Sequence, residues 1–412
     1  MSKSKYGIIS LLDIGSTKIV CFIVRMDSAG NSEVIGIGHQ SSQGFRAGNI
    51  TDIKLAESSI LSAIEAAEQM AEENIEKIIV NISGKIFSHH LVIHSSLASM
   101  PLTDRDLARI IAEGQEHYHQ PDVEVIHTVP LDYSIDGTEG IKDPIGMVGK
   151  KLTGKLNLVT TPSTSVVNLV NCMARCQLTV ADFTVSPYMA GLACLTPDEM
   201  ELGSTIIDMG GGTTSFALFK GGAMLYADSI PIGGRHVTSD IAHGLSTDMQ
   251  SAERTKTLDG HAIATSADSK IMINVPYIGE EDDSGIHTIP RALLVEIIIP
   301  RIEEILEMVR DRINASGFAP LASNNIVITG GASQLMGLKE LSSNIFGKHV
   351  RIGYPKSIDG LEESTKGAAF STIIGMVVYA SERVRQKQTG LNDNEEGSGR
   401  IGRILSWLQK NF

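Results

Sequence analysis

Apolar residues along the chain recur in two patterns, short continuous runs and longer stretches at helical spacing. The runs predict strands and the spaced stretches predict helices, so that strands and helices alternate. The predicted strands are 7–12, 18–24, 77–82, 204–207 and 325–328, and the predicted helices are about 54–72, 163–175, about 292–313 and about 366–379. This alternation is typical of an α/β layer fold.

The pattern changes between about residues 84 and 160. A strand near Leu91, a helix over 104–117, a strand near Val125 and a loop rich in glycine and proline over 137–149 follow one another there. We interpret this stretch as a small α+β module inserted into the larger fold.

The last part of the chain separates into a polar segment and an amphipathic one. Residues 381–399 are polar and predict a flexible linker. In a helix over 400–412, one apolar stripe spans an arc of about 100° and the opposite side is basic, the pattern of a helix lying in a membrane interface. The residues assigned to the membrane are Arg400, Ile401, Arg403, Ile404, Leu405, Trp407, Leu408 and Phe412. Docking of this helix on the protein's own core or on a partner is the alternative, and the long polar tether argues against it.

Composition narrows the class of protein. The 412 residues carry a formal net charge of −13, which argues against nucleic acid as a general partner. The four cysteines form no CxxC pair, which fits a reducing cytoplasm. No signal peptide is recognisable at the start, and no apolar run reaches the roughly 18 residues that a spanning helix needs. Any membrane contact is therefore expected to be peripheral.

A short motif occurs twice and indicates two halves of common design. In each copy an apolar strand ends in aspartate, and a turn of glycine and hydroxyl residues leads into another strand. The first copy contains Asp13, Gly15, Ser16 and Thr17, and the second contains Asp208, Gly210, Gly211, Gly212, Thr213 and Thr214. Either turn alone is more often an ordinary β-turn, but two copies with the aspartate in the same place are a stronger signal.

The chemistry of the repeated motif suits a polyphosphate with magnesium. Glycine turns let backbone N–H groups approach phosphate oxygens, and the hydroxyl groups add donors. Asp13 and Asp208 are the candidates for holding hydrated Mg²⁺, because Mg²⁺ prefers carboxylates together with water. Lys18 is close enough in sequence to neutralise phosphate charge.

A third glycine turn follows the strand at 325–328. Its residues Gly330, Gly331, Ala332 and Ser333 suit close packing against an adenine or ribose, although an ordinary βα turn has the same pattern. In this order the three motifs resemble the phosphate 1, phosphate 2 and adenosine motifs of the actin, hexokinase and Hsp70 superfamily. The resemblance implies two ribonuclease H-like domains with ATP between them, and it adds Gly233, Gly234, Glu253 and Lys256 as ribose and adenine contacts. No P-loop or GxGxxG fingerprint with a suitably spaced acid competes with it.

Within that superfamily the chain resembles the FtsA family of bacterial cell division proteins. The inserted module with its loop at 139–147, the stretch 203–222, and the linker with a terminal amphipathic helix carry the resemblance. It implies an α/β, actin-like ATPase fold with an SHS2-like inserted subdomain, called 1C. The implied parts are domain 1 over 1–83, 162–202 and a closing helix at 364–380, the inserted subdomain over 84–161, domain 2 over 203–363, the linker over 381–399 and the membrane helix over 400–412.

The resemblance also implies a function, that of an ATP-binding protein that polymerises on the cytoplasmic face of the inner membrane at the division septum. It implies that the protein anchors the FtsZ ring by binding the FtsZ C-terminal tail, with Arg301 and Glu304 as contacts, and that it helps to recruit later division proteins. The two residues also fit the solvated face of an amphipathic helix. Ser186 stands where hydrolysing relatives carry an acid or a Gln-like group, so weak or no ATPase activity is expected.

Other functions of the same superfamily remain as alternatives. An MreB-like or ParM-like filament shares the motifs but lacks this insert and tail placement. A chaperone-like ATPase would need a peptide-binding domain after the ATPase body, where only the linker and thirteen residues follow. A small-molecule kinase would have little use for an amphipathic tail.

Overall fold

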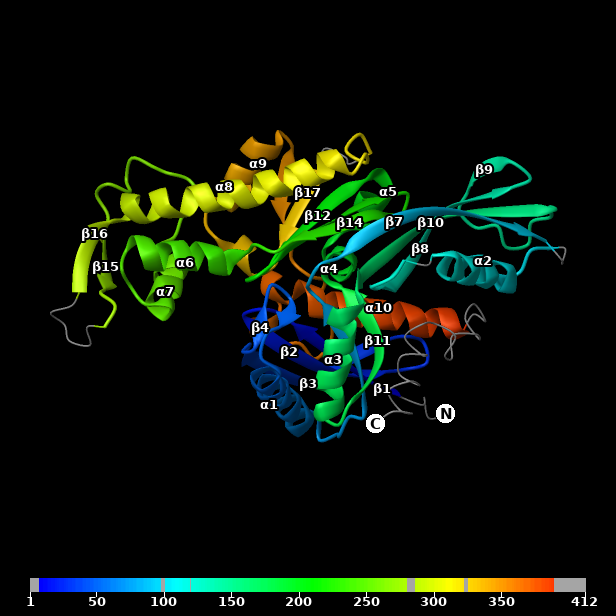
Figure 1. Ribbon diagram of the computed structural model, residues 1–412, viewed down its shortest axis with the longest axis horizontal. Helices are drawn as coiled ribbons and strands as arrows, with labels where there is room; N and C mark the ends of the chain where they lie inside the picture. Colours follow the sequence, from blue (N-terminus) through cyan, green and yellow to red (C-terminus); the bar gives the residue numbers. More distant parts are fainter. Residues whose placement is uncertain (1–6, 98–100, 119, 280–285, 322–324, 389–412) are drawn as a thin grey trace.

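Two five-stranded sheets form the body of the protein in the computed structural model, which describes residues 7–97, 101–118, 120–279, 286–321 and 325–388 (Figure 1). The first sheet has the order β11-β6-β1-β2-β3. Its strands are β1 (Gly7–Ile14), β2 (Lys18–Met26), β3 (Ser32–Ser41), β6 (Lys77–Ile82) and β11 (Thr179–Val185). Strands β1, β2 and β3 pair antiparallel, and β6 and β11 add parallel to β1.

The second sheet repeats this design with the order β14-β13-β12-β17-β18. Its strands are β12 (Ser204–Met209), β13 (Thr214–Lys220), β14 (Ala223–Ile230), β17 (Asn325–Thr329) and β18 (His349–Ile352). Strands β12, β13 and β14 pair antiparallel, and β17 and β18 follow in parallel. The repeated sequence motif thus lies at the same place, the first hairpin, in two sheets of equal topology.

Helices cover both faces of each sheet. Helices α1 (Ile53–Ala71) and α3 (Ser163–Arg175) bury one face of the first sheet. Helices α4 (Ser186–Cys194) and α10 (Ser371–Gln388) lie between the two sheets, where their apolar residues join both sheets in one core (Figure 1). The second sheet is covered on its other face by α6 (Gly234–Gly244), α8 (Arg291–Ala315) and α9 (Leu338–Phe346).

The inserted module is a separate antiparallel sheet, order β7-β10-β8-β9, with one helix against it. It comprises β7 (Phe87–Ser96), α2 (Asp104–His117), β8 (Val123–Ile135), β9 (Thr138–Ile141) and β10 (Lys151–Pro162). It has its own core, built around Ile110, Leu152, Leu156 and Leu158, and it extends to one side of the body (Figure 1). The expected α+β insertion between the two parts of the first lobe is therefore present.

The remaining elements are short. They are the hairpin β4 (Phe45–Arg46) and β5 (Asn49–Ile50), α5 (Pro197–Leu202), α7 (Met249–Asp259), the outer hairpin β15 (Met272–Pro276) and β16 (Ile286–Pro290), and 3₁₀ turns at Gly331–Gln334, Glu363–Thr365 and Ala368–Phe370. Within the described residues, no helix has the length and apolar character that crossing a membrane requires.

Two sequence expectations about the last third of the chain need correction. The closing helix begins at Ser371 rather than near Lys366, because two 3₁₀ turns precede it, and it continues to Gln388. The expected linker therefore starts at least eight residues later than 381. Polar residues near the end of α10 make defined contacts. The Ser381 hydroxyl donates to the Val377 carbonyl at 2.9 Å, and Arg383 forms an ion pair with Asp182. Residues 389–412 lie outside the described part.

Candidate functional site

Two tight glycine turns with the same hydrogen bond form the centre of the site. In the β1–β2 turn the Gly15 N–H donates to the Lys18 carbonyl at 2.9 Å, and in the β12–β13 turn the Gly210 N–H donates to the Thr213 carbonyl at 2.9 Å. The two motifs predicted from the repeat are therefore equivalent in conformation as well as in sequence. Each turn leaves its remaining backbone N–H groups near the end of a strand that carries an aspartate.

The two turns, one from each lobe, lie in contact with each other. A Cβ atom on Gly211 would lie 2.7 Å from the Thr17 hydroxyl oxygen, and one on Gly212 would overlap the side chain of Ser16. Glycine is needed at both positions because the other lobe approaches so closely. Loops that are almost 200 residues apart in sequence thus form one polar surface.

The carboxylates of Asp13 and Asp208 lie at these turns, and Lys18 interacts electrostatically with both. Burial raises the pKa of Asp13, whereas Lys18 and a hydrogen bond from Asn81 lower it. Burial and the neighbouring Asp13 carboxylate raise the pKa of Asp208 to about 6. The Lys18 ammonium donates to the Ala369 carbonyl and lies 3.8 Å from the centre of the Phe370 ring. Burial lowers the pKa of Lys18, although both carboxylates raise it. The charges of the site are therefore coupled.

Two residues that the sequence did not single out, Asn81 and Thr372, hold the aspartates. The Asn81 amide at the end of β6 donates to Asp13 at 3.0 Å and to the Ser186 hydroxyl at 2.9 Å. The Thr372 hydroxyl, from the first turn of α10, donates to Asp208 at 3.1 Å. No local motif marks these two residues. They reach the aspartates because β6 pairs with β1 in the first sheet and α10 crosses between the two lobes, and neither arrangement can be recognised from a short stretch of sequence.

The N-terminus of α6 is hydrogen-bonded to the second glycine turn, between β12 and β13. The Gly234 N–H donates to the Gly210 carbonyl at 2.9 Å, and the Arg235 N–H donates to the Gly211 carbonyl at 2.7 Å. A Cβ atom on Gly233 would lie 2.9 Å from the Gly211 carbonyl oxygen, so this position also requires glycine. The Thr214 hydroxyl points away to the Ile232 carbonyl at 2.8 Å, so Thr214 holds the turn rather than facing the cleft.

Glu253 and Lys256 of α7 lie beside the same helix N-terminus. The Lys256 ammonium donates to Glu253 at 2.7 Å, to the Thr238 hydroxyl at 2.8 Å and to the Gly234 carbonyl at 3.2 Å. The turn predicted as the adenosine motif meets Gly234 from the other side, where a Cβ atom would lie 3.0 Å from Cβ of Ala332. These residues form one edge of the cleft.

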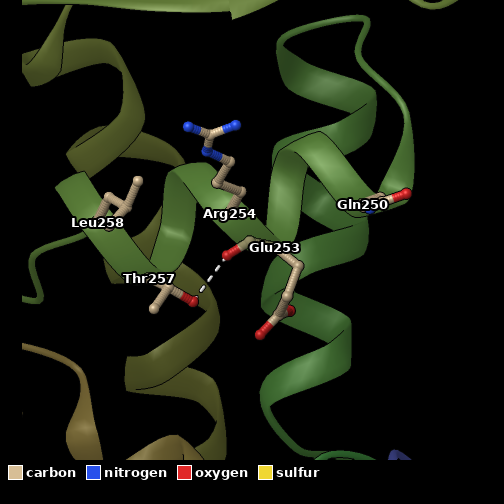
Figure 2. A pocket seen from close by; sticks show the side chains of 5 residues that line it. All are labelled: Gln250, Glu253, Arg254, Thr257 and Leu258. Atoms are coloured by element: carbon tan, nitrogen blue, oxygen red, sulfur yellow. Dashed lines mark hydrogen bonds between the residues drawn. The ribbon is translucent and has the colours of Figure 1, made fainter. Parts of the chain in front are cut away.

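A shallow pocket on α7 touches this edge. It is lined by Gln250, Glu253, Arg254, Thr257 and Leu258, and Figure 2 shows that Glu253 and Arg254 point in different directions from the helix. The Thr257 hydroxyl donates to the Glu253 carbonyl at 2.8 Å. The pocket shares only Glu253 with the predicted nucleotide residues, so it is a neighbouring surface.

The third glycine turn packs directly on the second aspartate. Gly330 has a φ of +91°, and a Cβ atom there would overlap a carboxylate oxygen of Asp208 and lie 2.5 Å from the Met209 carbonyl oxygen. The Ser333 hydroxyl is buried and donates back to the Gly330 carbonyl at 2.7 Å. Gly331 opens a 3₁₀ turn rather than the expected α-helix, and α9 starts only after Gly337.

The side chains and backbone groups at the two turns can be compared with the ligands that magnesium and a nucleotide prefer. The described part of the chain contains no group of three or more His, Cys, Asp or Glu side chains that could enclose a metal ion by themselves. Two carboxylates beside glycine turns suit an ion that keeps several waters and binds phosphate oxygens, as Mg²⁺ does.

The residues expected to contact a protein partner lie elsewhere, on α8. Arg301 pairs with Asp240 of α6 at 2.6 Å and also with Glu304. The hydrogen bond to Asp240 is the largest cause that raises the pKa of Arg301, and burial opposes it by lowering this pKa. Arg301 is thus already engaged within the protein. The residues assigned to the membrane, 400–412, lie outside the described residues.

Comparisons with known proteins agree with this geometry. A family model described as "Cell division protein FtsA" matches residues 205–375, and one described as "SHS2 domain inserted in FTSA" matches residues 83–160. The cell division protein FtsA of Agrobacterium fabrum is 40% identical, with 100% of this chain and 96% of that protein aligned. The cell division protein FtsA of Escherichia coli is 30% identical, with 97% of both aligned.

Solved structures resemble the chain in fold. A "PilM-PilN type IV pilus biogenesis complex" has a TM-score of 0.63 at 16% identity, covering 90% of this chain and 98% of that one. MreB5 of Spiroplasma citri bound to AMPPNP has a TM-score of 0.55 at 14% identity, covering 93% and 98%. The fold is accordingly that of the actin-like ATPases, with an SHS2 domain inserted, as the motif resemblance implied.

Proposed function

The chain belongs to the FtsA family of bacterial cell division proteins, and from this premise we propose that it binds Mg-ATP in the cleft between its lobes. One observation supports this most directly, namely that two glycine turns of equal conformation, each next to an aspartate, touch across the cleft. In the proposed complex the turns bind the phosphates, Lys18 offsets their charge, and Asp13 and Asp208 hold Mg²⁺ through water.

The base and ribose belong at the edge formed by α6, α7 and the third glycine turn. Gly233, Gly234, Glu253, Lys256 and the 330–333 turn converge there. A solved relative in fold, MreB5 of Spiroplasma citri, is described as bound to AMPPNP. That description supports a nucleotide in this fold, and the assignment of individual residues to it here is our proposal.

Thermal unfolding with and without Mg-ATP tests the proposal. Bound nucleotide should raise the melting temperature, since a ligand that binds only the folded state stabilises it. Gly211→Ala should abolish this shift, because the added methyl group meets Thr17. Gly7→Ala is the matched control, as its methyl group would meet nothing within 4 Å. A variant Gly211→Ala that still gains the full shift would contradict the proposed phosphate site.

We further propose that ATP is bound tightly and hydrolysed slowly. Ser186 begins α4, where its hydroxyl accepts from the Asn81 amide and donates to the Ile82 carbonyl. Among the described residues, no carboxylate or imidazole that would activate it as a base is hydrogen-bonded to this hydroxyl. Phosphate release by the purified protein should therefore be slow. Rapid turnover would contradict this part of the proposal.

Membrane attachment is proposed from the amphipathic pattern of residues 400–412. A single interfacial helix binds only marginally, so stable attachment at the cytoplasmic face of the inner membrane needs several copies, which self-association into filaments would supply. Co-sedimentation with anionic liposomes, comparing the full chain with one ending at Glu396, tests the segment. Ile404→Asp should release the protein and Ser406→Asp should not, because both add the same charge but on opposite faces of the helix. Equal pelleting of all four proteins would refute the assignment.

The proposed protein partners are the C-terminal tail of FtsZ and later division proteins. Arg301 and Glu304 are the proposed contacts for the FtsZ tail, which would have to compete with the Arg301–Asp240 ion pair. Binding of an FtsZ tail peptide should weaken in Arg301→Ala. Arg310→Ala is the control on the same helix, since Arg310 pairs with Glu307 in a similar exposed position. Unchanged peptide affinity in Arg301→Ala would move the contact elsewhere.

Membership of the family also suggests how the chain divides into domains. We propose domain 1 over 1–83, 162–202 and 364–380, the inserted domain over 84–161, and domain 2 over 203–363. The linker is proposed to start after Gln388, where α10 ends.

A further inference from the structure

The turn between β4 and β5 touches both phosphate turns, although no sequence motif marks it. The Gly48 N–H donates to the Ser16 hydroxyl at 3.3 Å. The Ala47 nitrogen lies 3.3 Å from the position that a Cβ atom on Gly212 would take. This small hairpin therefore lies at the phosphate end of the cleft, in contact with one turn from each lobe.

The backbone of this turn leaves a donor without a partner. Ala47 and Gly48 have φ angles of +48° and +74°, the positive values that a two-residue hairpin turn requires and that alanine rarely adopts. Ala47 is half-buried, and within the described residues its N–H has no hydrogen-bond acceptor. A partly buried backbone N–H without a partner is available to an acceptor. An acceptor supplied by a ligand in the cleft would complete the site.

The other side of the same turn contacts the start of the inserted domain. A Cβ atom on Gly48 would overlap the backbone of Gly84 and lie 2.7 Å from the Ser83 carbonyl carbon. The Ser83 hydroxyl in turn donates to the Ile14 carbonyl at 2.7 Å, directly before the first phosphate turn. The segment that leads into the inserted domain is thus packed against the phosphate end of the cleft.

The second lobe holds the same segment from the opposite side. The Ser229 hydroxyl of β14 donates to the Gly84 carbonyl at 3.0 Å and accepts the Ile86 N–H at 3.2 Å. The Ser88 hydroxyl bonds both backbone groups of Ala227, with distances of 2.8 and 3.1 Å. Any change in how the lobes close around phosphate must therefore act on residues 83–88.

We propose that the Ala47–Gly48 turn donates the Ala47 N–H to the terminal phosphate of bound ATP, and that it passes the presence of this phosphate to the inserted domain through residues 83–88. This inference rests on the proposed ATP binding and goes further, because it assigns a third phosphate contact and a route by which ATP and ADP are distinguished. A donor aimed at a charged oxygen favours the nucleotide that carries the additional phosphate.

The experiment measures binding and backbone protection separately in the full chain. Calorimetry with Mg-ATP and with Mg-ADP gives the two affinities, and amide hydrogen exchange gives the protection of residues 44–51 and 83–96. The expected results are a preference for ATP of roughly tenfold, the size of one hydrogen bond to a charged group, and protection of both segments by ATP but not by ADP. Binding of neither nucleotide would overturn the proposed ATP function itself. Binding with equal affinities and equal exchange would overturn this inference alone.

Substitutions test the proposed phosphate contact and the proposed route to the inserted domain separately. Gly48→Ala should remove the preference for ATP, because its methyl group meets Gly84 and displaces the turn. Gly140→Ala is the control for strain, since Gly140 also has a positive φ, +81°, but has open space around it. Ser229→Ala leaves the phosphate turns unchanged and should keep the ATP preference while losing the protection of 83–96. Full ATP-specific protection in both Gly48→Ala and Ser229→Ala would refute the proposed route.

Discussion

Asp13 and Asp208 end equivalent strands of the two sheets, and their carboxylates repel each other across the cleft. Each aspartate stands in the first hairpin of its sheet, before the matching glycine turn. Burial and this repulsion raise the pKa of Asp208 to about 6. Two carboxylates held close together destabilise each other's charged form, and a nearby cation offsets this cost.

The raised pKa of Asp208 predicts how stability depends on pH without nucleotide. Between the ordinary value of 3.8 and about 6, the folded state binds a proton that the unfolded state has released. The free energy of unfolding should therefore fall as pH rises through this window, by about 1–3 kcal/mol from this group. Asp208→Asn should remove this part of the dependence and be more stable than the natural chain at about pH 7. Urea unfolding at several pH values measures this free energy. If it changes with pH in the same way for Asp208→Asn and for the natural chain, the raised pKa of Asp208 is contradicted.

Lys18 should be essential to the charge balance of the same site. Lys18→Met removes a cation that interacts with both carboxylates, so the chain should lose about 3 kcal/mol of stability at about pH 7. The loss should shrink toward about pH 5, because the carboxylates can then take up protons. Lys366→Met, which breaks an exposed pair with Glu363, is the control and should cost less than about 1 kcal/mol. A loss that does not change with pH would point to packing instead of charge.

The sequence predicted correctly the bounds of helices whose ends are marked by capping residues. Helices α2 and α3 have the bounds expected from the pattern, 104–117 and 163–175, because Thr103 with Asp106 forms a capping box and Pro162 precedes the first turn of α3. The two glycine turns were also recognisable, since glycine, hydroxyl residues and aspartate stand together in each.

Contacts between distant segments could not be predicted in this way. Asn81 and Thr372 reach the aspartates from a strand and a helix whose sequences carry no nucleotide motif. The end of α10 has the composition of a linker, but Arg383 pairs with Asp182 and Arg385 donates to the carbonyls of Ala29 and Gly30, all far away in sequence. The Ala47–Gly48 turn was missed for the same reason.

Asn81 should stabilise the site through its buried hydrogen bonds. Asn81→Ala removes the donor to Asp13 and leaves Ser186 and Thr184 without their amide partner, so it should cost about 2–3 kcal/mol and weaken Mg-ATP binding. Asn31→Ala removes the same kind of bond, a side-chain amide to Asp27 at 2.8 Å, from an exposed turn. That control should lose about 0.5 kcal/mol or less. Equal losses in the two variants would show that burial of the Asn81 network has no special effect.

Gly330 should tolerate no side chain, for two separable reasons. Its φ of +91° strains any other residue, and a methyl group would press on Asp208 and Met209. Gly347 also has a positive φ, +62°, but its Cβ would meet nothing within 4 Å, so Gly347→Ala measures the backbone strain alone, about 1 kcal/mol. Gly330→Ala should cost about 3 kcal/mol and lose the thermal shift with Mg-ATP, because Asp208 is displaced. If the two variants lose equal stability and both keep the nucleotide shift, then the third glycine turn does not position Asp208.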